Sequence, residues 1–133
     1  MFFRNIIEVN TKKGVSFVDI TDKIESVVKS CQIQEGLCNI FITATTAGLM
    51  INENERMLFE DFIRLFEKLT PEEKLYSHPS NAFSHIRANL LKTDYTIPIS
   101  RSKLVLGTWQ RIILWEFDVE PRKREIIVTL NGA

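Results

Sequence analysis

The chain has 133 residues, of which 44% are apolar and 26% are charged, as in an ordinary globular domain. Lysine plus arginine and aspartate plus glutamate both number 17, so the zero net charge gives no electrostatic argument for a nucleic acid or an anionic membrane as partner. No apolar run approaches the roughly 20 residues of a membrane span, and no signal peptide is evident, so we expect one cytoplasmic domain over residues 1–133.

The first forty residues predict two strands and a helix. Apolar residues alternate loosely over residues 2–9 and recur over residues 15–20, and the turn 11–14 between them predicts a β-hairpin. Thr21 or Asp22 is then placed to cap a helix, whose apolar face is formed by Ile24, Val27, Val28 and Cys31. The short apolar run 37–43 predicts a buried strand. Cys31 and Cys38 are the only cysteines, and two free thiols are favoured over a disulfide.

The middle of the chain predicts two helices separated by a loop. Residues 44–54 are small and hydroxylated at first and then acidic and amidic. A helix is expected to follow to about Leu69, because apolar residues recur at helical spacing and Pro71 lies just beyond its end. A loop over residues 70–80 leads to Ser80, which is placed to cap a short helix that contains His85 and ends near Leu91.

The C-terminal third predicts three strands, over residues 95–99, 104–117 and 125–130. The second is the longest apolar run, and we expect a central strand with a bulge or a close backbone approach at Gly107. Gln110 and Glu116 interrupt it, and burying such a group unpaired costs about 2–7 kcal/mol when neutral and more when charged. These side chains therefore either reach the surface or converge on a site. The element order predicts an α+β fold, a single compact domain with a largely antiparallel sheet packed with helices.

The only two histidines are His78 and His85. On one helix they would lie about 10 Å apart along the axis, too far for one ion bound about 2.1 Å from each ring. Pro79 disfavours helical geometry at His78, so we expect His78 on a loop and His85 on the following helix. That arrangement can fold both rings onto one ion, although the spacing alone favours separate capping, surface or packing roles.

Three further polar groups have both a structural and a functional interpretation. The threonine pair 45–46 follows a predicted buried strand, where hydroxyl groups can meet a ligand, but a plain turn is favoured. The segment 52–54 precedes a helix, and helix capping is its favoured role. Arg122 and Arg124 can bind a phosphate or carboxylate through paired hydrogen bonds, but a solvated basic turn between two strands is favoured.

A specific combination of short motifs occurs in order along the chain. The motifs are Thr45-Thr46-Ala47-Gly48, Ile51-Asn52-Glu53-Asn54, Tyr76-Ser-His78, Asn81-Ala82 with His85, Leu104-Val-Leu-Gly-Thr-Trp-Gln110, Glu116-Phe-Asp118 and Pro121-Arg122-Lys-Arg124. Together they resemble the YjbQ-like family, which is catalogued as uncharacterised and sometimes labelled a secondary thiamine-phosphate synthase. The similarity runs from the first predicted strand to Gly132.

The resemblance implies a compact α+β domain that assembles as a homotrimer, with three histidines in its site and zinc as the expected divalent metal. Two of these histidines correspond to His78 and His85. The third corresponds to Ala44, which can neither bind a metal nor transfer a proton, so Glu53 or a residue of another subunit would have to complete the ligand set. The chain also departs from the family at Lys92 and Ser102, where glycine is frequent.

The resemblance further implies one site gathered from several segments, within one chain or across a subunit boundary. His78 and His85 are the candidate metal ligands, and the candidate catalytic residues are Glu53, His85 and Glu116. A phosphate-bearing small ligand is expected to meet the candidate anion-binding residues Thr45, Thr46, Asn52, Gln110, Arg122 and Arg124. Trp109 would add a ring wall, although core packing is its favoured role.

Three functions compete. The first is a metal-assisted enzyme acting on a small phosphorylated or pyrophosphorylated heterocycle, a transferase in the manner of thiamine-phosphate synthesis. The second is a non-catalytic homotrimer that binds a metal or an anion, its catalysis lost with the histidine that Ala44 replaces. The third is a purely structural or regulatory trimer.

Overall fold

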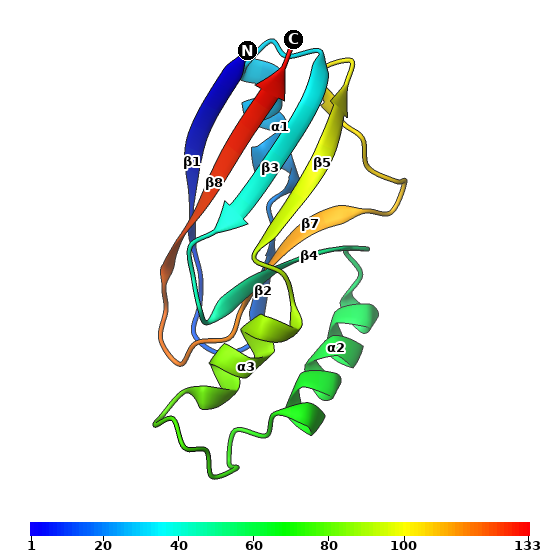
Figure 1. Ribbon diagram of the computed structural model, residues 1–133. Helices are drawn as coiled ribbons and strands as arrows, with labels where there is room; N and C mark the ends of the chain where they lie inside the picture. Colours follow the sequence, from blue (N-terminus) through cyan, green and yellow to red (C-terminus); the bar gives the residue numbers. More distant parts are fainter.

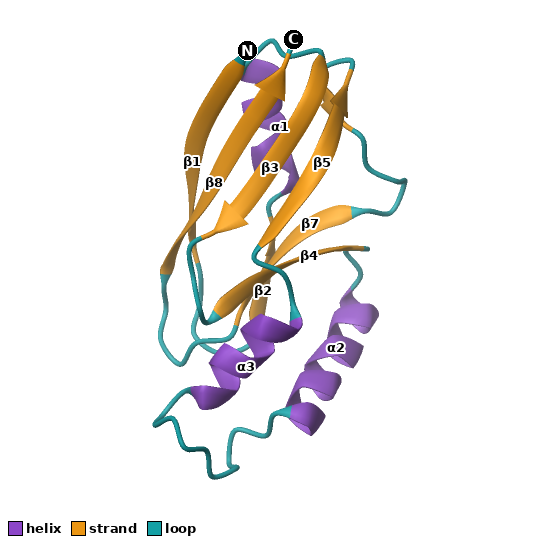
Figure 2. Ribbon diagram, in the orientation of Figure 1, coloured by secondary structure: helices purple, strands orange, loops and turns teal.

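A five-stranded antiparallel sheet forms one layer of the computed structural model, which describes all residues from 1 to 133 (Figures 1 and 2). Its strand order is β1-β8-β3-β5-β6. The bounds are β1 Phe2–Asn10, β8 Lys123–Gly132, β3 Glu35–Ile42, β5 Asp94–Ser100 and β6 Lys103–Leu104. The first and last long strands are therefore neighbours, and both chain termini lie at the same end of this sheet.

A second antiparallel sheet of three strands has the order β2-β7-β4, with β2 Ser16–Asp19, β7 Arg111–Glu116 and β4 Ala47–Asn52. One face of its central strand packs into the larger core through Ile112 and Leu114. The other face packs into a second core through Ile113 and Trp115. Because both faces of β7 are covered, its sequence is apolar at successive positions instead of alternating.

Three helices complete the fold: α1 Thr21–Ser30, α2 Arg56–Leu69 and α3 Ala82–Leu90. Helix α1 lies behind the five-stranded sheet and buries Ile24 and Val28 in the larger core (Figure 1). Helix α2 buries Phe59 and Phe66 against Trp115, with ring centroids 5.5 Å from the indole in both cases. The α+β prediction is confirmed, with helices and antiparallel strands in separate layers.

Two predictions about strand pairing are wrong. Strands β1 and β2 do not form a hairpin, because β1 pairs with β8 in one sheet and β2 pairs with β7 in the other. The predicted strand 104–117 is divided, because Leu104 ends β6 in the large sheet and β7 begins at Arg111 in the small one. Between them, Gly107 N–H donates to Gln110 Oε1 at 2.7 Å, and this local turn carries the chain across.

Several local predictions also need correction. Thr21 is the first helical residue and does not cap α1; its hydroxyl donates to Asp19 Oδ1 at 2.7 Å. Glu55 caps α2, accepting from the backbone of Met57 and Leu58, so the segment 52–54 does not have that role. The N-cap position of helix α3 is occupied by Asn81 and not by the predicted Ser80. Strand β3 is buried on one face only, and the segment after it contains the unpredicted strand β4.

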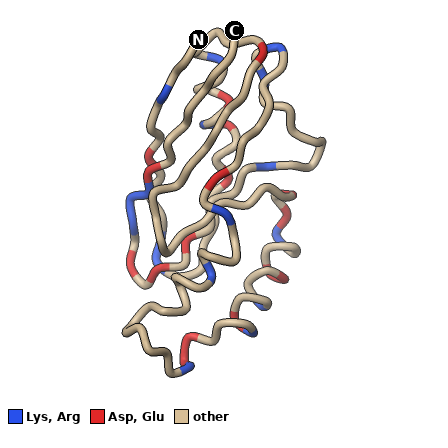
Figure 3. Tube along the Cα trace, in the orientation of Figure 1, with Lys and Arg blue, Asp and Glu red and all other residues tan.

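The surface carries both charge signs without separation. Acidic and basic residues interleave along α2, while the middle of β3 and β8 is uncharged (Figure 3). None of the three helices combines the length and the apolar character that crossing a membrane would need. Cys31 and Cys38 are both buried and unbridged, as the spacing predicted.

Candidate functional site

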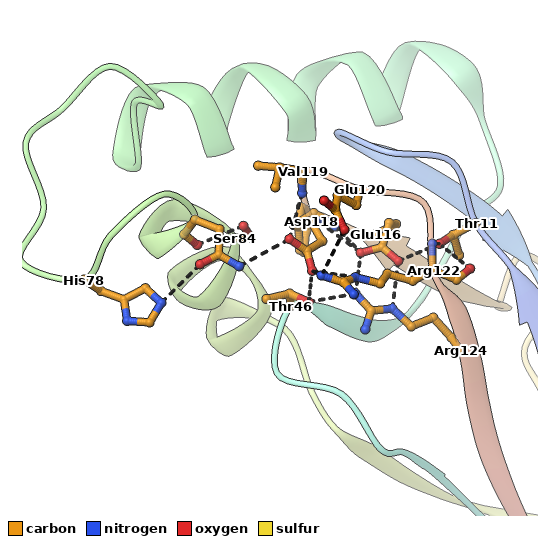
Figure 4. Close-up of polar contacts among 12 residues, drawn as sticks. Thr11, Thr46, His78, Ser84, Glu116, Asp118, Val119, Glu120, Arg122 and Arg124 are labelled. Carbon is orange, nitrogen blue, oxygen red and sulfur yellow. Dashed lines mark hydrogen bonds and ion pairs between the residues drawn. The ribbon is translucent and has the colours of Figure 1, made fainter.

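A buried ion pair lies at the end of β7. The side chain of Glu116 is fully buried. Arg124 of β8 donates two hydrogen bonds to it, from Nε to Oε1 at 2.7 Å and from Nη2 to Oε2 at 2.6 Å (Figure 4). Thr11 donates its hydroxyl to Oε1 at 2.6 Å, and two backbone N–H groups donate to Oε2. These five bonds use the four lone-pair positions of the carboxylate, so Glu116 has no acceptor left for a substrate proton.

Asp118 is a second buried carboxylate beside the first. Its Oδ2 accepts from Thr46 Oγ1 at 3.1 Å and from Arg122 Nε at 2.9 Å. Its Oδ1 accepts from Val119 N–H at 2.7 Å and from Asn81 Nδ2 at 3.2 Å. Burial alone raises the pKa of the Asp118 carboxyl, but the combined hydrogen bonds outweigh it and lower the pKa below its usual value. Asp118 is therefore a buried anion that fixes the surrounding donors.

The network continues from Asp118 to the histidines. Asn81 Oδ1 lies 3.1 Å from His78 Nε2, so one amide side chain joins the buried carboxylate to the exposed imidazole. The rings of His78 and His85 meet edge to face with centroids 4.8 Å apart. The expected loop-plus-helix arrangement is present, because His78 precedes α3 and His85 lies within it. It brings the two imidazoles together.

Two pockets adjoin at His85. One, of about 510 Å³, is lined by Ala44, Thr45, Ala47, His85, Ala88, Asn89, Leu91, Lys92, Thr93 and Asp94. The other, of about 430 Å³, is lined by Tyr76, Ser77, His78, Ala82, His85 and Ile86. Ala44 faces the same pocket as His85, although the two residues lie far apart in sequence. The half-buried His85 ring thus separates a polar pocket from a more apolar one.

Arg87 holds the loop that carries His78. This arginine is fully buried in α3, where Nε donates to Thr70 Oγ1 at 2.8 Å and Nη2 donates to Thr70 O at 2.9 Å. Burial lowers the pKa of its guanidinium, and Nη1 has no hydrogen-bond partner. The contact fixes the end of α2 against α3, so the loop over residues 71–80 begins and ends at anchored points.

The sequence-predicted site residues divide between two regions of the chain. The first region contains the two histidines and the buried carboxylates with their partners. Its predicted site residues are Thr45, Thr46, His78, His85, Glu116, Arg122 and Arg124. Asn52 pairs with Arg111 in the β4–β7 register, whereas Ala47 pairs with Glu116, so the two ends lie about 16 Å apart for five strand steps. Glu53, Trp109 and Gln110 are beside the Asn52 end. One chain does not bring the two groups together.

Two predicted anion-binding arginines have intramolecular partners. Arg124 donates hydrogen bonds to Glu116 and Thr46, and its side chain is only 11% exposed. Arg122 pairs with Asp118 but remains 43% exposed, which leaves part of its guanidinium facing solvent. Lys92, by contrast, lines the larger pocket without an acidic partner within salt-bridge distance, and its ammonium lies 5.4 Å from the centre of the Tyr95 ring. Lys92 therefore supplies the cation most available to a ligand there.

Three residues of the network escaped the sequence-based choice of site residues. Asp118 had a recognisable signal, because a carboxylate directly after a long apolar run must find donors. Asn81 had only its place within a motif, and Thr11 had no signal, because its partner Glu116 lies 105 residues away. Trp109, predicted to pack in the core, is 70% exposed.

The donor set for a metal is small. No group of three or more histidine, cysteine, aspartate or glutamate side chains is placed to hold an ion. The imidazoles of His78 and His85, with ring centroids 4.8 Å apart, are the only histidine pair in the chain.

Comparisons with known proteins agree on one group. A family model described as UPF0047 protein YjbQ-like matches residues 5–133. The chain is 44% identical to a UPF0047 protein of Archaeoglobus fulgidus, covering 92% of this chain and 96% of that one. It is 31% identical to UPF0047 protein YjbQ of Salmonella typhimurium, covering 99% of each. A crystal structure of a YbjQ-like protein of unknown function from Sulfolobus solfataricus, 34% identical, superposes with a TM-score of 0.94 over 100% of this chain and 99% of that one.

Proposed function

The chain belongs to the UPF0047 protein YjbQ-like family, and from that premise we propose that it is an enzyme acting on a small phosphorylated or pyrophosphorylated heterocycle. The observation that carries the proposal is the contact between the only two histidines, 4.8 Å apart where two pockets adjoin. Paired imidazoles at a pocket can transfer protons or bind a metal.

The pocket also suits an anionic group. Thr45, Thr93 and Asn89 line it with hydroxyl and amide groups, and Lys92 adds a positive charge that is not in salt-bridge contact with Asp94, the one carboxylate of the lining. An ammonium beside hydroxyl donors attracts a phosphate group as a point charge. In this proposal the phosphate lies near Lys92 and Thr45, and the uncharged ring of the ligand lies near His85. Arg122 contributes its exposed face, while Arg124 supports the site from within.

A divalent metal, zinc above others, is the proposed cofactor. His78 and His85 would hold it, and when bound it would neutralise charge on a phosphate oxygen. Catalytic zinc sites commonly have three protein ligands, so an ion held by two is expected to exchange readily. Glu53 lies at the far end of β4 in the same chain, so any ligand role for it would need a second copy.

Zinc retention tests the metal role, with Ala44→His as a gain-of-function variant. Ala44 lines the same pocket as His85, so an imidazole at position 44 would supply the third ligand that the family resemblance implies. We expect the wild type to keep clearly less than one zinc per chain after brief chelation, and Ala44→His to keep close to one. Ala44→Gln is the matched control, because it adds similar bulk without an imidazole. Full retention by the wild type would show that another ligand replaces the histidine, and no gain in Ala44→His would refute the proposed geometry.

Turnover tests the enzyme proposal itself. The wild-type protein with added zinc is incubated with a panel of pyrophosphorylated pyrimidines and thiazole phosphates, and release of pyrophosphate is measured. We expect release with at least one pair, and a loss of at least about tenfold in His85→Gln. Binding of these compounds without release by any variant would instead support the non-catalytic alternative.

The alternative is a homotrimer that binds a metal or an anion without catalysis. It is favoured by the absence of a third histidine and by the uncovered outer face of the five-stranded sheet, where Ile6, Leu37 and Phe41 are 51%, 53% and 42% exposed. Exposed apolar patches of this kind mark contact surfaces. Sedimentation equilibrium tests the assembly: a trimer that dissociates in Phe41→Glu supports this face as the interface, and a monomeric wild type refutes it.

A further inference from the structure

We infer that Asn81 fixes the proton of the neutral His78 ring on Nε2 and thereby presents Nδ1 as the only lone pair of that imidazole. The inference concerns one residue that acts through another, so Asn81 is a positioning residue. It rests on two hydrogen bonds, 3.2 Å from Asn81 Nδ2 to Asp118 Oδ1 and 3.1 Å between Asn81 Oδ1 and His78 Nε2.

The first step is the orientation of the amide. Asp118 is 2% exposed, and its ionised carboxylate can only accept hydrogen bonds. The hydrogen bonds it already accepts from Thr46, Arg122 and Val119 N–H favour this ionised form. The Asn81 atom that faces it must therefore be the NH₂ group. The flipped amide would place its carbonyl oxygen against a buried carboxylate, and two acceptors at 3.2 Å repel each other.

The second step is the tautomer of the ring. With the NH₂ group facing Asp118, the carbonyl oxygen of Asn81 faces His78 Nε2. A carbonyl oxygen has no proton to donate, so the hydrogen bond exists only when Nε2 carries the proton. A neutral imidazole carries one ring proton, and Nδ1 is then left with the lone pair. The buried charge of Asp118 thus decides, through one amide, which nitrogen of an exposed histidine can react.

The side chain of Asn81 is free to have this role. Although Asn81 precedes α3, its side chain makes no capping bond with the helix. The backbone carbonyl of Asn81 accepts from Ser84 N–H instead. Replacing the side chain is therefore expected to leave the start of α3 intact, so that an effect on His78 can be separated from unfolding.

The consequence for the site is a choice of atom. A zinc ion or a substrate proton at His78 must meet Nδ1, while Nε2–H remains bonded to Asn81. Metal-binding histidines commonly donate their second N–H to an oxygen in this way, which orients the ring. The metal part of this consequence rests on the proposed function, whereas the tautomer of the metal-free protein does not.

The test is ¹⁵N NMR of the full chain with labelled histidine, recorded at about pH 8.5, where imidazoles are neutral. With only two histidines, His85→Gln assigns the His78 signals. We expect a protonated Nε2 and an unprotonated Nδ1 in the metal-free wild type, and a mixture that includes the other tautomer in Asn81→Ala. A dominant Nδ1–H form in the wild type, or the same populations in both proteins, would overturn the inference.

A zinc titration then separates the inference from the proposed function. We expect the Nδ1 signal of wild-type His78 to shift while Nε2 keeps its proton. Zinc on Nε2 would overturn the inference. No shift at either nitrogen would count against the metal role alone, because the metal-free spectrum already decides the role of Asn81. Backbone spectra and circular dichroism of Asn81→Ala check that the fold is retained, and should the variant unfold, the wild-type tautomer remains decisive.

Discussion

Removing Arg124 should destabilise the protein strongly through the charge it leaves behind. In Arg124→Met the aliphatic bulk is largely kept, but Glu116, whose side chain is 0% exposed, loses two charge-assisted hydrogen bonds. Breaking a buried pair from one side costs about 3–5 kcal/mol, because the remaining charge is buried without compensation. Against a total stability of about 5–15 kcal/mol, this is a large share.

The same loss predicts a thermal shift. At about 2.1 cal/mol/K of unfolding entropy per residue, a chain of this length loses roughly 3–4 °C of melting temperature per kcal/mol, so the midpoint should fall by roughly 10–18 °C. Urea unfolding followed by circular dichroism measures the free energy directly, provided that the slope against urea is unchanged.

A matched control lies one residue away. Lys123 pairs with Glu8 at 2.9 Å, but both side chains are more than half exposed, so Lys123→Met should unfold close to the wild type. The double variant Glu116→Gln with Arg124→Met should recover part of the loss, because it removes the stranded charge. An Arg124→Met midpoint no lower than that of Lys123→Met would refute the claim that this pair is buried and essential.

Three further predictions concern single residues. Ser102 has a φ of 62° in the β5–β6 turn, so Ser102→Gly should raise the free energy of unfolding by about 0.5–1 kcal/mol in urea, and a decrease would contradict the strain. Because the pKa of Asp118 is lowered on folding, its contribution is complete above the unfolded value of about 3.8 and is lost as the pH falls below it; acid unfolding should therefore depend less steeply on pH in Asp118→Asn. Burial, with the nearby charges of Glu25 and Cys31, raises the pKa of Cys38 to about 12, so this thiol should resist a thiol reagent at pH 8 until urea is added, and rapid native labelling would contradict its burial.

The local elements followed from sequence because their causes are local. The spacing of apolar residues in α2, together with Pro71 beyond its end, predicted a helix to about Leu69. In the structure α2 ends at Leu69. The same reasoning failed where pairing depends on distant strands. The sequence of residues 104–117 does not indicate that Leu104 and Arg111 belong to different sheets. The pairing of each strand is determined by its neighbours across the sheet.

The candidate site shows the same division. Local rules placed His78 on a loop and His85 on a helix, because Pro79 disfavours the helical conformation before it. The order of motifs indicated the family, which the comparisons confirm. Glu116, which accepts hydrogen bonds from Arg124, could not be assigned a structural role from the sequence. Its hydrogen-bond partners come from positions 11, 117, 118 and 124.

By itself, the sequence determined the α+β class, the positions of most helices and strands, the two free thiols and the family, because propensity, periodicity and motif order act over short stretches of chain. Only the tertiary structure decided which polar groups became buried supports and which kept a free face. That outcome depends on desolvation: Glu116 and Asp118 are held by donors from four separate segments, and the histidines acquire their setting only after those segments meet.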